Sequence, residues 1–235
     1  MSAINKNKII HSIVSSKERI ILHLQKTIRT HDFDYKTFGT AIEDFVLNEV
    51  IDILKEEKII LGKDDFKRAE NKNEFPDLRI IKPCLLALEV KSGNHSRKKG
   101  GQWIACKNSN NDMGTLNMWT KKIKEFGGEN IYYIFIEYNF NDSVKEILDV
   151  KVKPFYEFLI YSESRILRYR EKDGNLRPKD FDSQPKIISA KEFEGLLLKT
   201  RWYRSSRIIK KHIKSLPEEQ LDKLYKELGL ILKIK

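Results

Sequence analysis

Residues 75–93 constrain this chain most, because they read as two short strands joined by a tight turn at residues 83–84. Side chains along a strand alternate between its two faces, so Glu89 and Lys91 share one face, whereas Leu86, Leu88 and Val90 share the other. Folding the hairpin at that turn brings Asp77 roughly opposite Glu89 and Val90. Two carboxylates and an ammonium group are therefore expected to converge at one end of an otherwise apolar hairpin.

This charged cluster predicts a cation site. Burying a charged group costs several kcal/mol unless the group is paired or bound to a metal ion. Magnesium takes oxygen ligands, often one or two carboxylates together with a substrate phosphate. The hairpin supplies those carboxylates, and a purely structural reason for three charged groups in it is hard to find.

The composition fits one domain that binds a polyanion. The chain has 235 residues, of which 40% are apolar and 34% are charged, and its net charge is +11. Such an excess of positive charge favours nucleic acid, and anionic membrane less so. The two cysteines and five histidines form no zinc pattern, so we expect a reducing, cytoplasmic location. We expect neither a signal peptide nor a membrane span, since no apolar run approaches about 18 residues.

Two amphipathic helices are predicted before the hairpin. Residues 9–28 carry apolar positions at helical spacing, and residues 35–57 do so again. On the second helix Glu43 falls on the buried arc, whereas Asp44 falls on the solvated side. Glu43 is thus either a third carboxylate facing the site or part of a salt bridge at the edge of the arc, and Glu49 lies near the same arc.

Three basic segments follow the hairpin. The first is a glycine-bracketed loop directly after Lys91, the second a turn-rich loop at residues 171–180, and the third the basic, aromatic half of a long helix at residues 189–216. Each segment is a candidate contact for phosphates or bases. The alternative interpretation of each is an ordinary charged surface exposed to solvent. The candidate DNA-binding residues are Ser92, Asn94, Arg97, Lys98, Lys99, Gln102, Asn175, Arg177, Lys179, Arg201, Arg204 and Arg207.

The remaining elements predict the fold class. Residues 131–138 are almost continuously apolar, as in a central strand, and residues 153–161 and 165–170 read as two more strands. A short helix is expected within residues 108–128. Helices therefore precede, interrupt and follow a set of strands, which predicts an α/β fold with a central mixed β-sheet flanked by helices.

The hairpin resembles the signature of the PD-(D/E)XK nucleases. Pro76-Asp77, eleven intervening residues and then Glu89-Val90-Lys91 match that pattern on the strands where the family carries it. Glu43 is similar to the helical acid found upstream in many members. Residues 35–93 resemble EcoRV-like type II restriction endonucleases in particular, although Glu89 stands where their pattern has aspartate.

The resemblance implies a restriction-endonuclease-like core within a single domain, residues 1–235. Residues 1–34 would form a dimerisation helix and residues 35–140 the catalytic core. Residues 141–235 would supply further strands, a DNA-reading loop and basic C-terminal helices.

The resemblance also implies a type II restriction endonuclease that cuts double-stranded DNA at a short palindrome. The catalytic residues would be Asp77, Glu89, Lys91 and Glu43. Mg²⁺ would be held by Asp77, Glu89, Glu43 and the Val90 carbonyl, with Lys91 positioning the attacking water or stabilising charge. Such an enzyme acts as a homodimer, and a cognate DNA methyltransferase protects the host DNA.

Two alternatives remain open from the sequence. A structure-specific or repair nuclease of the same superfamily, such as a junction resolvase, would share the site and cut by shape. A catalytically idle DNA-binding protein would share the basic segments but would not need all of Asp77, Glu89, Lys91 and Glu43.

Overall fold

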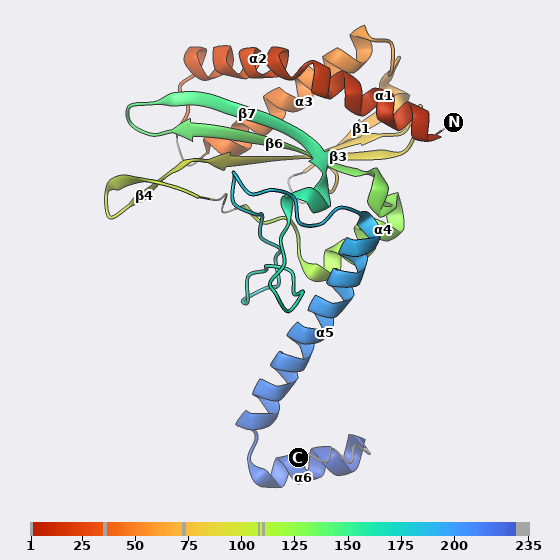
Figure 1. Ribbon diagram of the computed structural model, residues 1–235, viewed down its shortest axis with the longest axis vertical. Helices are drawn as coiled ribbons and strands as arrows, with labels where there is room; N and C mark the ends of the chain where they lie inside the picture. The colour runs from red at the N-terminus through yellow and green to blue at the C-terminus, as the bar shows by residue number, and fades with distance from the viewer. Residues whose placement is uncertain (1, 35–36, 72–73, 108, 110, 229–235) are drawn as a thin grey trace.

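A computed structural model describes residues 2–34, 37–71, 74–107, 109 and 111–228. Its centre is a five-stranded mixed sheet between two helical layers, as the sequence predicts (Figure 1). The inner strands β3 and β6 run parallel, and the other neighbouring pairs are antiparallel. In spatial order the strands are β1 (Phe66–Arg68), β2 (Leu78–Ile80), β3 (Leu86–Asn94), β6 (Ile131–Phe140) and β7 (Lys145–Pro154).

The hairpin of β2 and β3 has the predicted register. Leu78 pairs with Leu88, which places Asp77 opposite Glu89. The predicted alternation also holds, because Leu88 belongs to the apolar core on one side of the sheet and Ala87 to the core on the other. The two faces of β3 therefore pack against the two different helical layers of the fold.

Three helices cover the first face of the sheet, namely α1 (Ser2–Ser15), α2 (Lys17–Thr30) and α3 (Phe38–Glu56) (Figure 1). The prediction of one continuous helix over residues 9–28 is therefore wrong, because the helix is interrupted at Ser16. The Ser15 hydroxyl donates to the Ser12 carbonyl at 3.1 Å, a local bond of the kind that competes with continuous helix.

The second face is covered by α4 (Leu116–Phe126), a 3₁₀ turn (η3, Phe155–Phe158) and the first half of α5 (Ala190–Ser215). Trp119 of α4 stacks on Phe155 with ring centroids 4.1 Å apart. The rest of α5 extends away from the body to α6 (Glu218–Leu228) (Figure 1). None of the described helices is long and apolar enough to cross a membrane.

The basic loop predicted after Lys91 is instead a two-stranded ribbon. Strands β4 (Ser96–Lys99) and β5 (Gln102–Ala105) pair antiparallel and project from the end of β3 (Figure 1). Gly100 and Gly101 form its turn with φ of 57° and 83°, the left-handed pair that a two-residue hairpin requires. Charged residues are depleted in strands, which explains why the sequence reads as a loop.

The strands predicted for residues 153–161 and 165–170 are also misplaced. The chain forms β7 earlier, and the later segments make only isolated bridges, such as the one between Tyr161 and Leu167. The sequence pattern does not indicate strand β7, because exposed or charged residues separate its buried residues Ile147 and Val150. Likewise, β1 lies inside the charged connector predicted for residues 63–72.

We expect Phe38→Ala to destabilise the protein strongly, because Phe38 lies in the apolar core between the sheet and helices α1 to α3. The fully buried Phe38 ring lies 4.7 Å from the Tyr138 ring and 4.8 Å from the Phe140 ring, between centroids. Truncation should lower the free energy of unfolding by about 3–5 kcal/mol, as for other buried aromatic residues. Urea denaturation followed by circular dichroism measures this. Leu22→Ala, at a side chain 68% exposed, is the control and should stay within about 0.5 kcal/mol of wild type.

Candidate active site

The site forms where β2 ends and β3 continues. The Val90 amide donates to Asp77 Oδ2 at 2.7 Å, and the Asp77 amide donates to Glu89 Oε2 at 3.3 Å. Strand pairing between β2 and β3 stops at Leu78, so the Asp77 side chain takes the place that a further strand residue would hold. These bonds hold the two carboxylates side by side at the end of β2.

Lys91 completes this cluster from the same face of β3. Its ammonium donates to the Val90 carbonyl at 2.9 Å and lies 2.9 Å from Glu89 Oε1. The Lys91 side chain is only 18% exposed and Glu89 is buried. The convergence of acid, acid and lysine that the hairpin pattern predicts is thus present.

The charges in the cluster shift one another's proton affinity. Burial, and then the Glu89 charge, raise the pKa of Asp77 to about 6. Burial acts to lower the pKa of Lys91, but Glu89, Asp77 and Glu43 outweigh it and raise that pKa above its ordinary value. Lys91 is therefore positively charged at neutral pH, and that form stabilises negative charge and cannot accept a proton.

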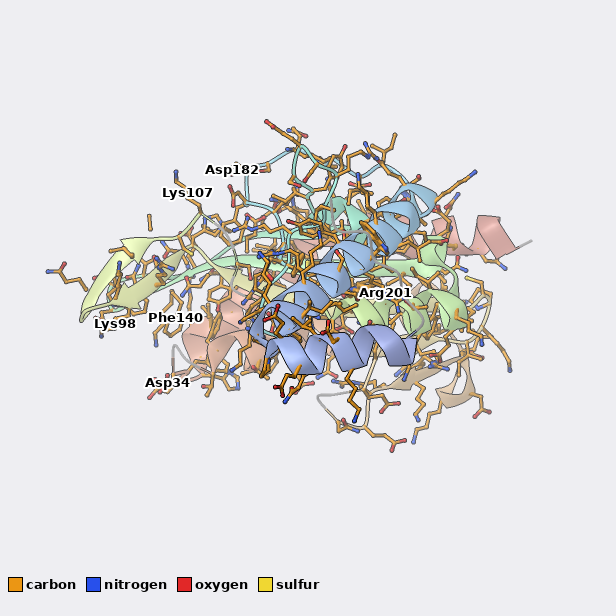
Figure 2. The ribbon with its side chains drawn as sticks, turned by 90° about the horizontal axis from the view of Figure 1, so that it is seen from below. Asp34, Lys98, Lys107, Phe140, Asp182 and Arg201 are labelled. Carbon is orange, nitrogen blue, oxygen red and sulfur yellow. The ribbon has the colours of Figure 1, made fainter. Side chains whose placement is uncertain are left out.

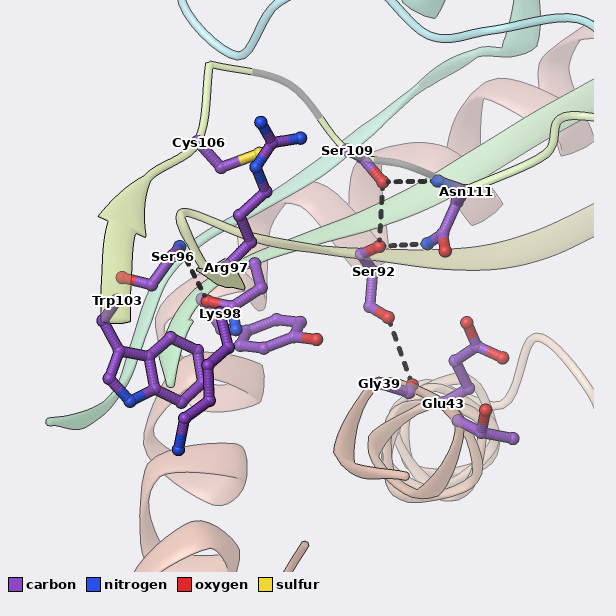
Figure 3. A pocket seen from close by; sticks show the side chains of 13 residues that line it. Gly39, Glu43, Ser92, Ser96, Arg97, Lys98, Trp103, Cys106, Ser109 and Asn111 are labelled. Carbon is purple, nitrogen blue, oxygen red and sulfur yellow. Dashed lines mark hydrogen bonds between the residues drawn. The ribbon is translucent and has the colours of Figure 1, made fainter. Parts of the chain in front are cut away.

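Glu43 faces this cluster from α3. It lies on the side of the helix that faces β3 (Figure 3), and burial is the main cause that raises its pKa to about 8. Asp77 and Glu89 raise it further, whereas Lys91 lowers it. The sequence left open whether Glu43 faces the site, and the structure places it there. Glu49, on the same helix, instead pairs with Arg19 of α2 at 2.5 Å.

Close packing of α3 on β3 brings Glu43 to the site. The Ser92 hydroxyl donates to the Gly39 carbonyl at 3.1 Å, and a Cβ at Gly39 would lie 2.8 Å from Ser92 Oγ (Figure 3). A cavity of about 350 Å³ opens beside this contact. Its lining includes Gly39, Glu43, Ser92, Asn94, Arg97, Lys98, Trp103 and Asn111 (Figure 3).

The residues present fit a divalent cation held by two carboxylates. Within the described ranges, no three histidine, cysteine, aspartate or glutamate side chains are grouped to hold a metal ion. Asp77 and Glu89 are together, and burial, followed by the negative charge of Glu89, raises the pKa of Asp77, so a bound cation would favour its ionised form. The Val90 carbonyl accepts a hydrogen bond from Lys91, and the roles of Val90 and Glu43 as metal ligands stay predictions. Magnesium commonly uses one or two protein carboxylates, with water and phosphate oxygens as its other ligands.

The predicted DNA-binding residues of the first segment divide between ribbon and core. Arg97, Lys99 and Gln102 are exposed on the ribbon. Lys98, also on the ribbon, lies over the Trp103 ring. Asn94 and Ser92 are used inside the chain: the Asn94 side chain donates to the Phe140 carbonyl at 2.9 Å, and Ser92 is 5% exposed.

The candidate residues of the other two segments have partners within the chain. Asn175 donates to Asp112 at 3.2 Å, and Arg177 lies 2.9 Å from the same carboxylate. The intrachain partners of the others are the Ser183 carbonyl for Lys179, Thr120 for Arg201, and Glu171 for Arg204 and Arg207. Figure 2 shows Lys98 on the ribbon and Arg201 on α5 at separate places. Base reading by residues 175–179 stays a prediction.

Lys122 of α4 is a site residue that the sequence reading missed. Its ammonium lies 3.6 Å from the Phe75 ring centroid and 4.9 Å from that of Trp119, and the residue is 7% exposed. Burial lowers the pKa of Lys122 to about 8, although Glu89 and Asp77 act to raise it. The signal was available, because Lys122 shares the buried stripe of the helix with Trp119 and Phe126.

Comparison with known proteins shows the fold. The structure is similar to that of NlaIV restriction endonuclease, with a TM-score of 0.54 and 17% sequence identity over 87% of this chain and 79% of that chain. A scan against protein-family models finds no match, and a search of curated proteins finds no sequence relative. The chain therefore has a restriction-endonuclease-like fold, the class that its helices, mixed sheet and charged hairpin predict.

The raised pKa of Glu43 predicts that Glu43→Gln stabilises the metal-free protein. At pH 8 the unfolded chain has released this proton while the folded chain holds it, so wild-type stability falls between about pH 4.5 and 8. The variant should gain on the order of 1–3 kcal/mol over wild type at pH 8 and almost nothing at pH 4.5. Urea denaturation in EDTA at several pH values measures this.

Asp44→Asn is the matched control, since Asp44 is the exposed neighbour on the same helix. Its difference from wild type should be small throughout that range. A Glu43→Gln difference that stays constant with pH would contradict the assignment of Glu43 to the buried cluster.

Proposed function

We propose that this protein is a type II restriction endonuclease that hydrolyses phosphodiester bonds of double-stranded DNA in a Mg²⁺-dependent reaction. The observation that carries the proposal is the convergence of Asp77, Glu89 and Lys91 at the end of the β2–β3 hairpin. The similarity to a restriction endonuclease fold supports it. The net charge of +11 suits a polyanionic substrate.

The residues of the cluster have separate tasks in this reaction. Asp77 and Glu89 hold the cation, which when bound polarises the scissile phosphate and lowers the pKa of a coordinated water. Lys91 keeps its positive charge and offsets the negative charge that develops on the phosphate. Glu43 holds a proton near neutral pH in the metal-free site, so it can donate a hydrogen bond to a water molecule there.

The β4–β5 ribbon is the part of the molecule best suited to enter a groove of DNA. A two-stranded ribbon fits the major groove of B-form DNA, and this one exposes Arg97, Lys99 and Gln102 beyond the end of β3. One chain carries one such ribbon and one carboxylate cluster. Cutting both strands of a palindrome therefore calls for a homodimer with two-fold symmetry.

Substitutions in the cluster should separate cutting from binding. Asp77→Asn, Glu89→Gln and Lys91→Met each remove a charge with little change in shape, and each should slow cleavage at least about 10²–10³-fold. Binding of a labelled duplex with Ca²⁺ in place of Mg²⁺ should change only a few-fold. Asp44→Asn, at the exposed acid beside Glu43, is the control and should cut like wild type. Wild-type rates in Asp77→Asn or Glu89→Gln would remove the basis for the site.

Digestion of a plasmid with Mg²⁺ tests the class of nuclease. A restriction endonuclease yields discrete fragments whose lengths no longer change once digestion is complete, and sequencing their ends gives the recognition site. A smear, or cutting only at branched junctions, would identify a structure-specific nuclease instead. Binding with no cutting in any divalent cation would identify an idle DNA-binding protein.

A further inference from the structure

Lys122 is buried without an anionic partner. The residue is 7% exposed, and its nearest recorded neighbours are the faces of two aromatic rings, Phe75 at 3.6 Å and Trp119 at 4.9 Å from the centroids. Within the described part of the chain, the Lys122 ammonium makes no ion pair and no hydrogen bond, and its Nζ is not fully enclosed by the protein. The N–H donors of the Lys122 ammonium are therefore available to water or to a bound ligand.

This arrangement is costly for the protein alone. Burial disfavours the charged form of an ammonium, and attraction to an aromatic face offsets only part of that cost. An apolar side chain at position 122 would pack on the stripe of Trp119 and Phe126 without that cost. An ammonium that makes no hydrogen bond within the described protein, and that is not fully closed to solvent, is free to bind a ligand with acceptor oxygens.

The surroundings hold Lys122 firmly in place. The Trp119 indole donates to the Met113 carbonyl at 2.9 Å, which ties α4 to the segment before it. Gly114 in that segment has φ of 91°, and a Cβ there would lie 3.3 Å from Lys122 Nζ. An ammonium held this way loses little conformational freedom when a ligand binds.

The charges around Lys122 identify the kind of ligand. Its ammonium lies over the ring of Phe75, two residues before Asp77, and the charges of Asp77, Glu89 and Lys91 act on it there. When a divalent cation balances the two carboxylates, Lys91 and Lys122 remain as two uncompensated positive charges from different elements, β3 and α4. Such a pair attracts an anion with several oxygen atoms, which in a nuclease is the phosphodiester backbone.

We propose that Lys122 binds a backbone phosphate of the DNA at the active site, as a second substrate-binding lysine beside Lys91. This inference rests on the proposed nuclease function. It assigns α4 to the substrate-binding surface.

The salt dependence of DNA binding tests the proposal in Lys122→Met, which keeps an unbranched stem between the two rings. Each phosphate contact contributes about 0.9 to the slope of log K against log salt concentration. With Ca²⁺ present, fluorescence anisotropy of a labelled duplex between about 50 and 200 mM KCl should give a slope smaller than wild type by about 1. Cleavage with Mg²⁺ should slow about 10–100-fold, while the melting temperature stays the same or rises.

Two variants complete the comparison. Lys122→Arg keeps the charge and should keep the wild-type slope. Lys124→Met removes an exposed charge from the same helix and should also keep it. If the methionine variant fails to fold, Lys122→Gln repeats the measurement. Failure of both neutral variants to fold, while the arginine variant folds, would overturn the proposal in favour of a structural role.

The outcome also separates this inference from the proposed function. If the wild-type protein neither binds nor cuts DNA, the proposed function fails. If the wild-type protein does both, and a folded neutral variant at position 122 has the wild-type salt slope, only the phosphate contact is overturned.

Discussion

The hydrogen bond from the Val90 amide to the Asp77 carboxylate is the contact on which the rest of the site depends. It forms because β2 stops pairing at Leu78 while β3 runs on to Asn94, which leaves backbone groups of β3 without a strand partner. A side chain fills that gap, and its carboxylate is thereby held against Glu89. A longer β2 would satisfy the same backbone group and leave no room for an acid, so the short strand is what creates the site.

Burial then decides the behaviour of each charge. The sheet separates two apolar cores, and the cluster lies at the edge of the hairpin where helices of both layers approach it, α3 with Glu43 and α4 with Lys122. Removal from water raises the pKa of Asp77 and of Glu43, and it opposes the charge on each lysine. Lys91 keeps its charge because three carboxylates surround it, whereas Lys122 has two aromatic rings. The site thus places two acids and two lysines close together in surroundings that are largely closed to water.

The sequence predicted the parts of this arrangement that depend on local pattern. Alternation along β3 and the turn at residues 83–84 were enough to bring Asp77, Glu89 and Lys91 together, and helical periodicity placed Glu43 on a buried arc. The same reasoning missed the ribbon, because a run of basic residues reads as loop, and missed β7, whose apolar residues are interrupted by charged ones. It left open whether Glu43 faces the site or forms a salt bridge at the edge of the buried arc, because only the neighbouring elements of the fold decide between the two.

By itself, then, the sequence determined an α/β fold with a charged hairpin, because strand and helix periods are properties of neighbouring residues. The tertiary structure decided which distant groups share a site. It assigned Asn175 and Arg177 to Asp112 within the chain, and it brought Lys122 to the carboxylates from a separate helix. Those outcomes depend on how helices pack across the sheet, and such packing brings together side chains that no local pattern relates.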